Sequence, residues 1–287
     1  MTRRFAVTLR FSRGCASLAL ALALTACATV AVAPADELPA PAIERALAPL
    51  LPTDVLLLGE QHDAPAHQRR QRAVASALQG RGQWAALVIE MAERGGSTKG
   101  LPASATEAQA RSALRWERSE LAGWSWSIYS PLVMQAVRAG VPVWGGNLPR
   151  ADFRRAMQDT ALDGRLSSDA LMAQQARIRE GHCQLLPETQ VAPMTRIQIA
   201  RDLAMAATAE AAWQPGRTVL LVAGHQHVRR DLGVPLHLGA QVNARVIAMT
   251  TTTQSDLETP ASADLIWRTA PVDSPDHCAE LKSRLTR

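Results

Sequence analysis

The chain has 287 residues, of which 47% are hydrophobic, 20% are charged and 4% are aromatic. This composition is typical of a globular protein and excludes a disordered tail or a collagen-like repeat. The formal net charge of +5 is local, because residues 1–26 hold four arginines and no acid, which leaves 27 basic and 26 acidic side chains in the remainder. A nearly neutral body gives no electrostatic surface for DNA or RNA, so we expect no nucleic-acid partner.

Residues 1–26 are expected to form an export signal. Four arginines precede a short apolar run at residues 16–24, which is too short to cross a bilayer core of ~30 Å as a helix. The run ends in Leu24-Thr-Ala-Cys27, which resembles the cleavage site of bacterial lipoproteins. We therefore expect Cys27 to be the lipidated first residue of the mature protein. The alternative is a plain secretory signal that is cut near Ala33.

The residues after Cys27 predict the membrane to which the protein is anchored and the tether that joins the anchor to the body. Ala28 favours the outer membrane, on its periplasmic side, by the rule that applies to such lipoproteins. Residues 27–41 are rich in Ala and Pro and form the expected tether, and residues 42–287 form the body. No other apolar run is long enough for a spanning helix, so we expect a body that is anchored by lipid.

Two cysteines remain in the body once Cys15 is removed with the signal and Cys27 carries the lipid. Cys183 and Cys278 then lie in an oxidising compartment, where a disulfide is the usual outcome. The alternative is a thiol metal site, because a histidine precedes each of these cysteines. Neither belongs to a Cys-x-x-Cys pair, so we predict a disulfide between them.

Short apolar runs alternate with helical patterns along the body, which predicts an α/β fold with a mainly parallel sheet and flanking helices. The expected strands are residues 54–58, 84–89, 141–144, 218–222, 244–249 and 265–267. The expected helices are residues 64–78, 105–117 and 129–139. Residues 151–214 have a wholly helical pattern, and we expect them to be a helical insertion.

Polar residues follow the last apolar residue of four predicted strands. They are Glu60 with His62, Glu90, Asn147, and His225 with His227. The carboxyl ends of parallel strands meet at one edge of a sheet, and ligands bind in the crevice there. We therefore expect Glu60, His62, Glu90 and His227 to lie in one crevice.

The residue types in this crevice allow more than one chemistry. His62, Glu90 and His227 are suitable ligands for a divalent metal with open coordination positions. The same residues with Glu60 are also suitable as a general acid and base without metal. A third interpretation is a periplasmic binding module in which these residues only shape a network of turns. A serine hydrolase and a nucleotide-binding protein are disfavoured, because the chain has no Gly-x-Ser-x-Gly elbow and no glycine-rich phosphate loop.

Several segments that contain these residues also occur together in a known family. They are residues 57–62 with His67 and Gln71, 89–91, 124–129, 145–150, 183–187 with 198–202, and 223–235. In this order they resemble the ChaN-like family of haem-binding lipoproteins linked to iron uptake. The wider group includes Tiki-type metalloproteases and erythromycin esterase-like enzymes. The resemblance covers about residues 51–278.

The resemblance implies a haem in a crevice, an interface between two copies where two haems face each other, and an outer-membrane haem receptor as partner. A haem iron takes a His, Tyr, Cys or Met side chain as axial ligand. Tyr129, the one tyrosine of the chain, is the first candidate, although its setting also suits a buried core tyrosine. His182 is the second. Arg229 and Arg230 are candidates for the haem propionates, since charge-assisted pairs are favourable there.

The wider group implies an enzyme instead. Glu60, His62, Glu90 and His227 correspond to its metal or acid–base positions, and the reaction would be attack of a metal-activated water on an amide or ester. Haem binding in iron uptake is the preferred interpretation. A metal-dependent hydrolase, either a peptidase or an esterase, is the alternative.

Overall fold

The computed structural model describes residues 38–121, 123–251, 262–273 and 276–285, which belong to one compact unit, Pro34–Arg287. The expected export signal, the expected lipidation site at Cys27 and most of the expected tether lie outside these residues. No helix in the described ranges is long and apolar enough to cross a membrane.

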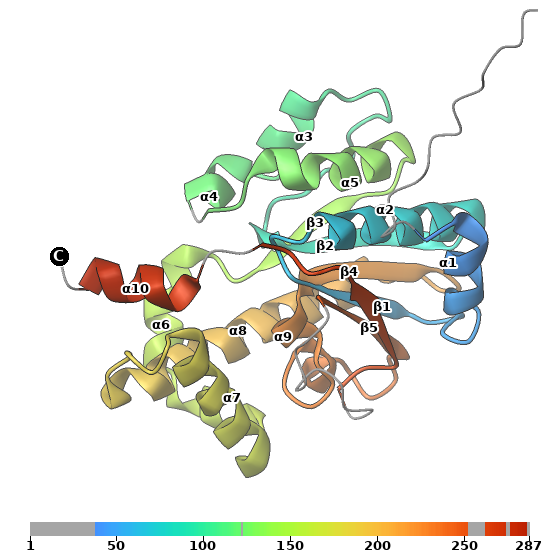
Figure 1. Cartoon of the computed structure of the whole chain (residues 1–287). Helices are drawn as coiled ribbons and strands as arrows, with labels where there is room; N and C mark the ends of the chain where they lie inside the picture. Colours follow the sequence, from blue (N-terminus) through green and yellow to red (C-terminus); the bar gives the residue numbers. More distant parts are fainter. Residues whose placement is uncertain (1–37, 122, 252–261, 274–275, 286–287) are drawn as a thin grey trace, which may run out of the picture. The chain divides into compact units, whose positions relative to one another are not determined.

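Six parallel strands form one sheet within the described residues, in the order β3-β2-β4-β1-β5-β6 (Figure 1). They are β1 (Val55–Glu60), β2 (Trp84–Glu93), β3 (Val143–Asn147), β4 (Thr218–Gly224), β5 (Ala244–Thr251) and β6 (Leu265–Thr269). Every residue of β1 and β4 is buried, as expected for parallel strands that are covered on both faces. The predicted α/β class with a parallel sheet and flanking helices is confirmed.

One face of the sheet is covered by helices from the first half of the chain. They are α1 (Ala40–Leu47), α2 (Pro65–Gly80), α3 (Glu107–Ala113), α4 (Trp116–Leu121) and α5 (Trp126–Arg138). Leu56 and Leu58 of β1 share an apolar core with Leu78 of α2 and Val133 of α5. Helix α1 begins inside the expected tether and buries Ile43.

The opposite face of the sheet packs on α8 (Glu188–Ala212), which runs beneath the strands (Figure 1). Val55 and Leu57, which alternate with the residues of the first face, share a core with Met205 and Ala209 of α8. The short helix α9 (His225–Val228) follows β4 directly. Alanines on α8 allow it to lie close to the strands, which places its polar residues near their carboxyl ends.

Residues 151–214 are less regular than the sequence predicts. Helices α6 (Phe153–Gln158), α7 (Ser168–Gly181) and α8 alternate with 3-10 turns at Arg150–Asp152 and Thr160–Arg165. The helical pattern is also broken between α7 and α8, because Cys183 and Gln184 have φ angles of +56° and +60°. A left-handed backbone at two successive residues cannot continue an α-helix.

The predicted disulfide between Cys183 and Cys278 is confirmed. It joins the turn between α7 and α8 to α10 (His277–Leu285). The bond closes a loop across 95 sequence positions, so it connects the helical region to the end of the chain.

Two element boundaries differ from the prediction near the crevice. Strand β2 does not end before Glu90 but continues to Glu93, with a register shift against β3 between Ile89 and Glu93. The helix expected at residues 105–117 is split into α3 and α4, because Arg115 has a φ of +55°. Both irregularities lie in segments that contribute residues to the candidate site.

Candidate functional site

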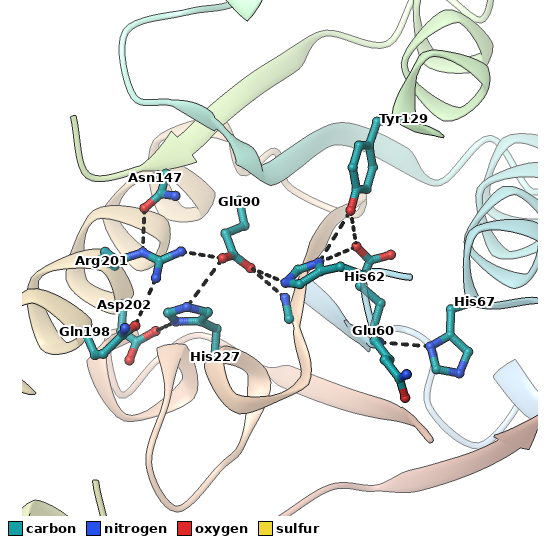
Figure 2. A network of polar contacts seen from close by, with 12 residues as sticks. Glu60, His62, His67, Glu90, Tyr129, Asn147, Gln198, Arg201, Asp202 and His227 are labelled. Atoms are coloured by element: carbon teal, nitrogen blue, oxygen red, sulfur yellow. Dashed lines mark hydrogen bonds and ion pairs between the residues drawn. The ribbon is translucent and has the colours of Figure 1, made fainter. Parts of the chain in front are cut away.

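The carboxyl ends of three neighbouring strands, β2, β4 and β1, bring the expected residues together (Figure 2). Glu60 is the last residue of β1 and lies opposite Gly224 of β4. The carboxylate of Glu90 on β2 has one oxygen 4.0 Å from His62 Nε2 and the other 3.5 Å from His227 Nε2. The two histidines therefore approach one carboxylate from opposite sides.

Gly224 allows this close approach. Its backbone N–H donates to Glu90 Oε2 at 2.6 Å, and a Cβ atom on this residue would lie only 2.8 Å from His62 Nε2. A larger residue would push His62 away from Glu90. The Gly-x-x-His segment at the end of β4 thus positions His62 as well as His227.

The buried half of the site consists of Glu90, Arg201, Asp202 and His227. Arg201 of α8 donates to Glu90 and also to Asn147 Oδ1 at 2.9 Å. Burial by itself would raise the pKa of Glu90, but His227, Arg201 and His62 outweigh burial and hold that pKa at about 2. Glu90 is therefore a permanent anion at physiological pH, paired with the guanidinium of Arg201.

His227 is fixed by a second carboxylate. Its Nδ1–H donates to Asp202 Oδ1 at 2.5 Å, and Asp202 is only 1% exposed. Burial raises the pKa of Asp202, although the neighbouring His227 acts in the opposite direction. The imidazole lies between two carboxylates, which fixes its orientation.

The open half of the site consists of Glu60, His62 and Tyr129. His62 Nδ1–H and the Tyr129 hydroxyl both donate to Glu60 Oε1 at 2.8 Å. The other oxygen of Glu60 accepts from the side-chain amides of Gln68 and Gln71. Glu60 is completely buried, whereas the His62 side chain is 36% exposed, so His62 forms the solvent-facing part of the site.

The ionisation of the open half follows from these contacts. Burial alone would lower the pKa of His62, but the hydrogen bond to Glu60 and the charge of Glu90 raise it above its usual value. Burial and the charge of Glu60 raise the pKa of Tyr129. Tyr129 is therefore a protonated hydrogen-bond donor in this structure.

His67 has a structural position behind the open half. Its Nδ1 accepts from the Gln61 backbone N–H at 2.9 Å, and its Nε2 lies 3.1 Å from the Thr269 hydroxyl. Burial, together with Arg70, lowers the pKa of His67 to about 4. A neutral His67 thus holds the loop that carries His62.

Two pockets lie beside the site, one at His62 and one at Arg201. The His62 pocket has a volume of about 320 Å³ and includes His62, Pro65, Arg69, Arg72, Ile128 and Pro131. The Arg150 pocket has a volume of about 240 Å³ and includes Glu93, Arg118, Trp124, Arg150, Phe153 and Arg201. The ring of Trp124 meets that of His62 edge-on, with centroids 4.5 Å apart. The two pockets therefore lie on the two sides of the His62–Trp124 contact.

Other predicted ligand residues lie outside both pockets. Arg229 forms a two-pronged ion pair with Asp231, and Arg230 pairs with Asp264. His182 Nδ1 lies 2.7 Å from the Ile178 carbonyl oxygen at the end of α7. None of the three predicted residues lines the His62 pocket or the Arg150 pocket.

A model of the family described as "Haem-binding uptake, Tiki superfamily, ChaN" matches residues 46–238. The chain belongs to this family. Its structure is similar to that of ChaN of Campylobacter jejuni with cofacial haem, with a TM-score of 0.62 and 22% sequence identity, covering 78% of this chain and 90% of that one. No curated protein sequence gives a significant match.

More distant structural similarity extends to two other proteins. A mutant of erythromycin esterase EreC in its open conformation has a TM-score of 0.45 and 15% identity, covering 75% of this chain and 74% of that one. The type III effector HopBA1 has a TM-score of 0.40 and 14% identity, covering 76% and 88% of the two chains. The family match contains both halves of the site described above, so these residues belong to the ChaN-family part of the chain.

The donor set does not fit a divalent metal. Within the described ranges, no group of three or more His, Cys, Asp or Glu side chains is arranged to hold a metal ion. Both oxygens of Glu90 already accept hydrogen bonds, one from Arg201 and one from Gly224. The cation that compensates this buried carboxylate is therefore the guanidinium of Arg201.

The residues fit haem in part. Haem combines an apolar macrocycle with carboxylates, and each of the two pockets combines apolar or aromatic side chains with arginines. Tyr129, the first candidate for the iron, is 2% exposed and lines neither pocket. It would ligate iron only after losing both its proton and its hydrogen bond to Glu60.

Arg201 and Asp202 have roles that the sequence analysis did not assign. They lie within an otherwise apolar, alanine-rich part of α8, where a charged pair is costly unless partners are present. The sequence shows this charged pair within an apolar helix segment, but it does not predict which strand end the pair contacts. In the sequence Trp124 belongs only to the family-like segment 124–129, and its contact with His62 depends on the fold.

Proposed function

We propose that this protein binds haem at the carboxyl edge of its sheet and serves haem or iron uptake at the cell envelope. Membership of the family described as haem-binding uptake carries the proposal. The two pockets support it, because their arginines suit the carboxylates of haem and their apolar side chains suit its macrocycle.

The proposed contacts come from both pockets. Pro65, Ile128 and Pro131 offer apolar surface in the His62 pocket, and Ile128 is 41% exposed. Trp124 and Phe153 offer aromatic surface in the Arg150 pocket. These contacts need no rearrangement of the buried half. Bound haem would supply redox-active iron, and we propose His62, which is 36% exposed and lines a pocket, as its ligand in place of the buried Tyr129.

A homodimer is part of the proposal. The pockets measure about 320 and 240 Å³, at or below the lower end of the ~300–1,000 Å³ that is usual for small-molecule sites. A haem held in them would keep one face exposed, and a second haem-loaded copy would cover that face. Sedimentation analysis should show dimer formation that increases with haem. A strict monomer when loaded would contradict this part.

The proposed location is the periplasmic face of the outer membrane, with an outer-membrane haem receptor as the source of ligand. It rests on the lipoprotein-like segment that ends at Cys27. Cys27→Ser should release the protein from the membrane fraction or leave it uncleaved. A processed Cys27→Ser protein that still sediments with membranes would contradict the anchor.

A haemin titration followed in the Soret region tests the main proposal. We expect a saturable spectral shift with one haem per chain. Bovine serum albumin and a haem-free buffer give the references for specific and non-specific spectra. An unchanged spectrum of free haemin in the presence of the protein would contradict haem binding.

Hydrolysis is the second candidate function, favoured by the hydrogen bond between His62 and Glu60 beside an open pocket. A histidine held by a carboxylate is the usual general base of acyl transfer. Release of p-nitrophenol from a p-nitrophenyl ester tests it. His62→Gln should abolish such activity, whereas His277→Gln, which changes an exposed histidine far along the chain, should retain it. Equal rates for the wild type and His62→Gln would exclude this role.

A further inference from the structure

We infer that the Arg150 pocket is a carboxylate-binding site and that it takes the propionate groups of haem. The inference rests on the proposed function and assigns one chemical part of the ligand to one set of residues. It replaces the expectation that Arg229 and Arg230 meet the propionates, since both are already held by aspartates.

The charge balance of the pocket carries the assignment. Its one lining carboxylate, Glu93, accepts the Arg150 backbone N–H at 2.9 Å and lies 3.5 Å from Arg118. Arg201, the third cation, is bound to Glu90 behind the pocket. Among the described residues, the guanidinium of Arg150 has no ion-pair partner. One cation at the mouth of the pocket therefore remains available for an added anion.

The shape of the surroundings favours an anion that is attached to a planar apolar body. Trp124 and Phe153 line the same pocket as Arg150. Trp124 also contacts His62, which lines the neighbouring pocket with Pro65, Ile128 and Pro131. A ligand whose carboxylates meet Arg150 can thus continue along Trp124 to apolar side chains. A small inorganic anion would use only the first of these features.

The His62 pocket is the competing position for the carboxylates, because Arg69 and Arg72 line it. It also contains Asp63, and the charge of His62 is already matched by Glu60. Its exposed apolar residue, Ile128, instead suits the macrocycle. The His62 pocket is therefore assigned to the apolar macrocycle, and the Arg150 pocket to the carboxylates.

The test compares haemin with haemin dimethyl ester, which lacks free carboxylates, on the full chain. Soret titrations are made on the wild type, Arg150→Gln, Arg72→Gln and the control Arg154→Gln, which removes an exposed arginine of α6 outside both pockets. Metal-free protoporphyrin IX, followed by fluorescence, repeats the test without iron. We expect Arg150→Gln to weaken haemin and protoporphyrin IX about five- to tenfold. Binding of the ester should not change.

Three results would overturn the assignment. Equal haemin affinity in the wild type and Arg150→Gln would remove the site while leaving the proposed function intact. A loss in Arg72→Gln without one in Arg150→Gln would move the carboxylates to the His62 pocket. A wild-type protein that binds neither porphyrin would contradict the proposed function and the site together.

Discussion

The buried half and the open half of the site contain the same residue types but have different surroundings. Each consists of a strand-end carboxylate and a histidine, yet Glu90 also pairs with the guanidinium of Arg201, while Glu60 also accepts from neutral donors. His227 is 8% exposed in the buried half, whereas the His62 side chain is 36% exposed in the open half. The buried half connects α8 and α9 to the sheet and reaches the Arg150 pocket through Arg201, whereas His62 of the open half lines the other pocket.

This difference shows how a carboxylate can be kept charged inside a sheet edge. A buried anion is tolerated only when cations or donors compensate its lost hydration. Glu90 obtains this compensation from other elements of the fold, so its contacts are part of the tertiary structure. Glu60 obtains most of it from α2 and α5, which leaves one edge of His62 available to a ligand. The following substitutions should separate these roles.

The largest effect is expected in the buried half, for Glu90→Ala. The substitution leaves Arg201 and His227 buried without their shared anion, which should lower the free energy of unfolding by about 3–5 kcal/mol. Urea denaturation measures the loss. Glu90→Gln, which retains the shape, should lose less. Glu93→Ala on the same strand, whose ion pair with Arg118 is exposed, should lose about 1 kcal/mol or less. Equal losses at Glu90 and Glu93 would contradict a special role for the buried half.

A second effect concerns pH and the support behind the open half. His67 has a pKa lowered to about 4 in the folded protein, so the unfolded chain binds its proton first and stability falls as the pH drops from about 6.5 to 4. Between pH 7 and 4.5 we expect a loss of about 2–3 kcal/mol from this residue. The pKa of Glu90, at about 2, places its own loss at lower pH.

Urea unfolding at pH 7 and pH 4.5 measures this pH effect in the wild type and His67→Gln. The variant should retain a smaller loss, because burial also lowers the pKa of His237 and that residue acts in the same direction. His277→Gln is the exposed control and should keep the wild-type loss. An unchanged loss in His67→Gln would show that His67 is not the neutral buried support described above.

The sequence predicted the sheet and the meeting of its polar ends well, because these depend on local patterns. Continuous apolar runs identify parallel strands, and the rule that their carboxyl ends share an edge brings Glu60, Glu90 and His227 together. The identity of their partners was not predictable in the same way. Arg201 and Asp202 come from the middle of a long helix, and only the crossing of α8 beneath the sheet brings Arg201 to Glu90 and Asp202 to His227.

The predictions that differ from the structure do so for similar physical reasons. The helix break at Cys183 depends on two residues in the left-handed conformation. Neither of them is a glycine, so the sequence does not predict the break. The C-terminal end of β2 was misplaced because the register shift after Ile89 leaves no sign in an apolar run. Arg229 and Arg230 were assigned to propionates on charge alone, whereas their partners Asp231 and Asp264 became evident only in the fold.

A third effect distinguishes the two proposed iron ligands within the open half. Tyr129→Phe removes a buried donor to Glu60 and should lower the free energy of unfolding by about 2 kcal/mol. Because the hydroxyl is buried and protonated, the haem dissociation constant should not change. Soret titration of the variant measures it. A lost or strongly shifted Soret band in Tyr129→Phe would establish Tyr129 as the ligand and require the open half to rearrange on binding.

The smallest effect on stability is expected for His62→Gln, which therefore tests the open half most directly. Glu60 keeps its hydrogen bonds from Tyr129, Gln68 and Gln71, so the loss should be about 1 kcal/mol or less. The pKa of His62 is raised, so its contribution is complete below pH 6.5 and disappears as the pH rises through the folded pKa. The wild type should thus lose a little stability above pH 6.5, and His62→Gln should not. Haem binding should respond more than stability does, since His62 lines one pocket and contacts Trp124 of the other. A variant as unstable as Glu90→Ala would show that both halves serve the fold, and that the exposed edge of His62 has no separate role.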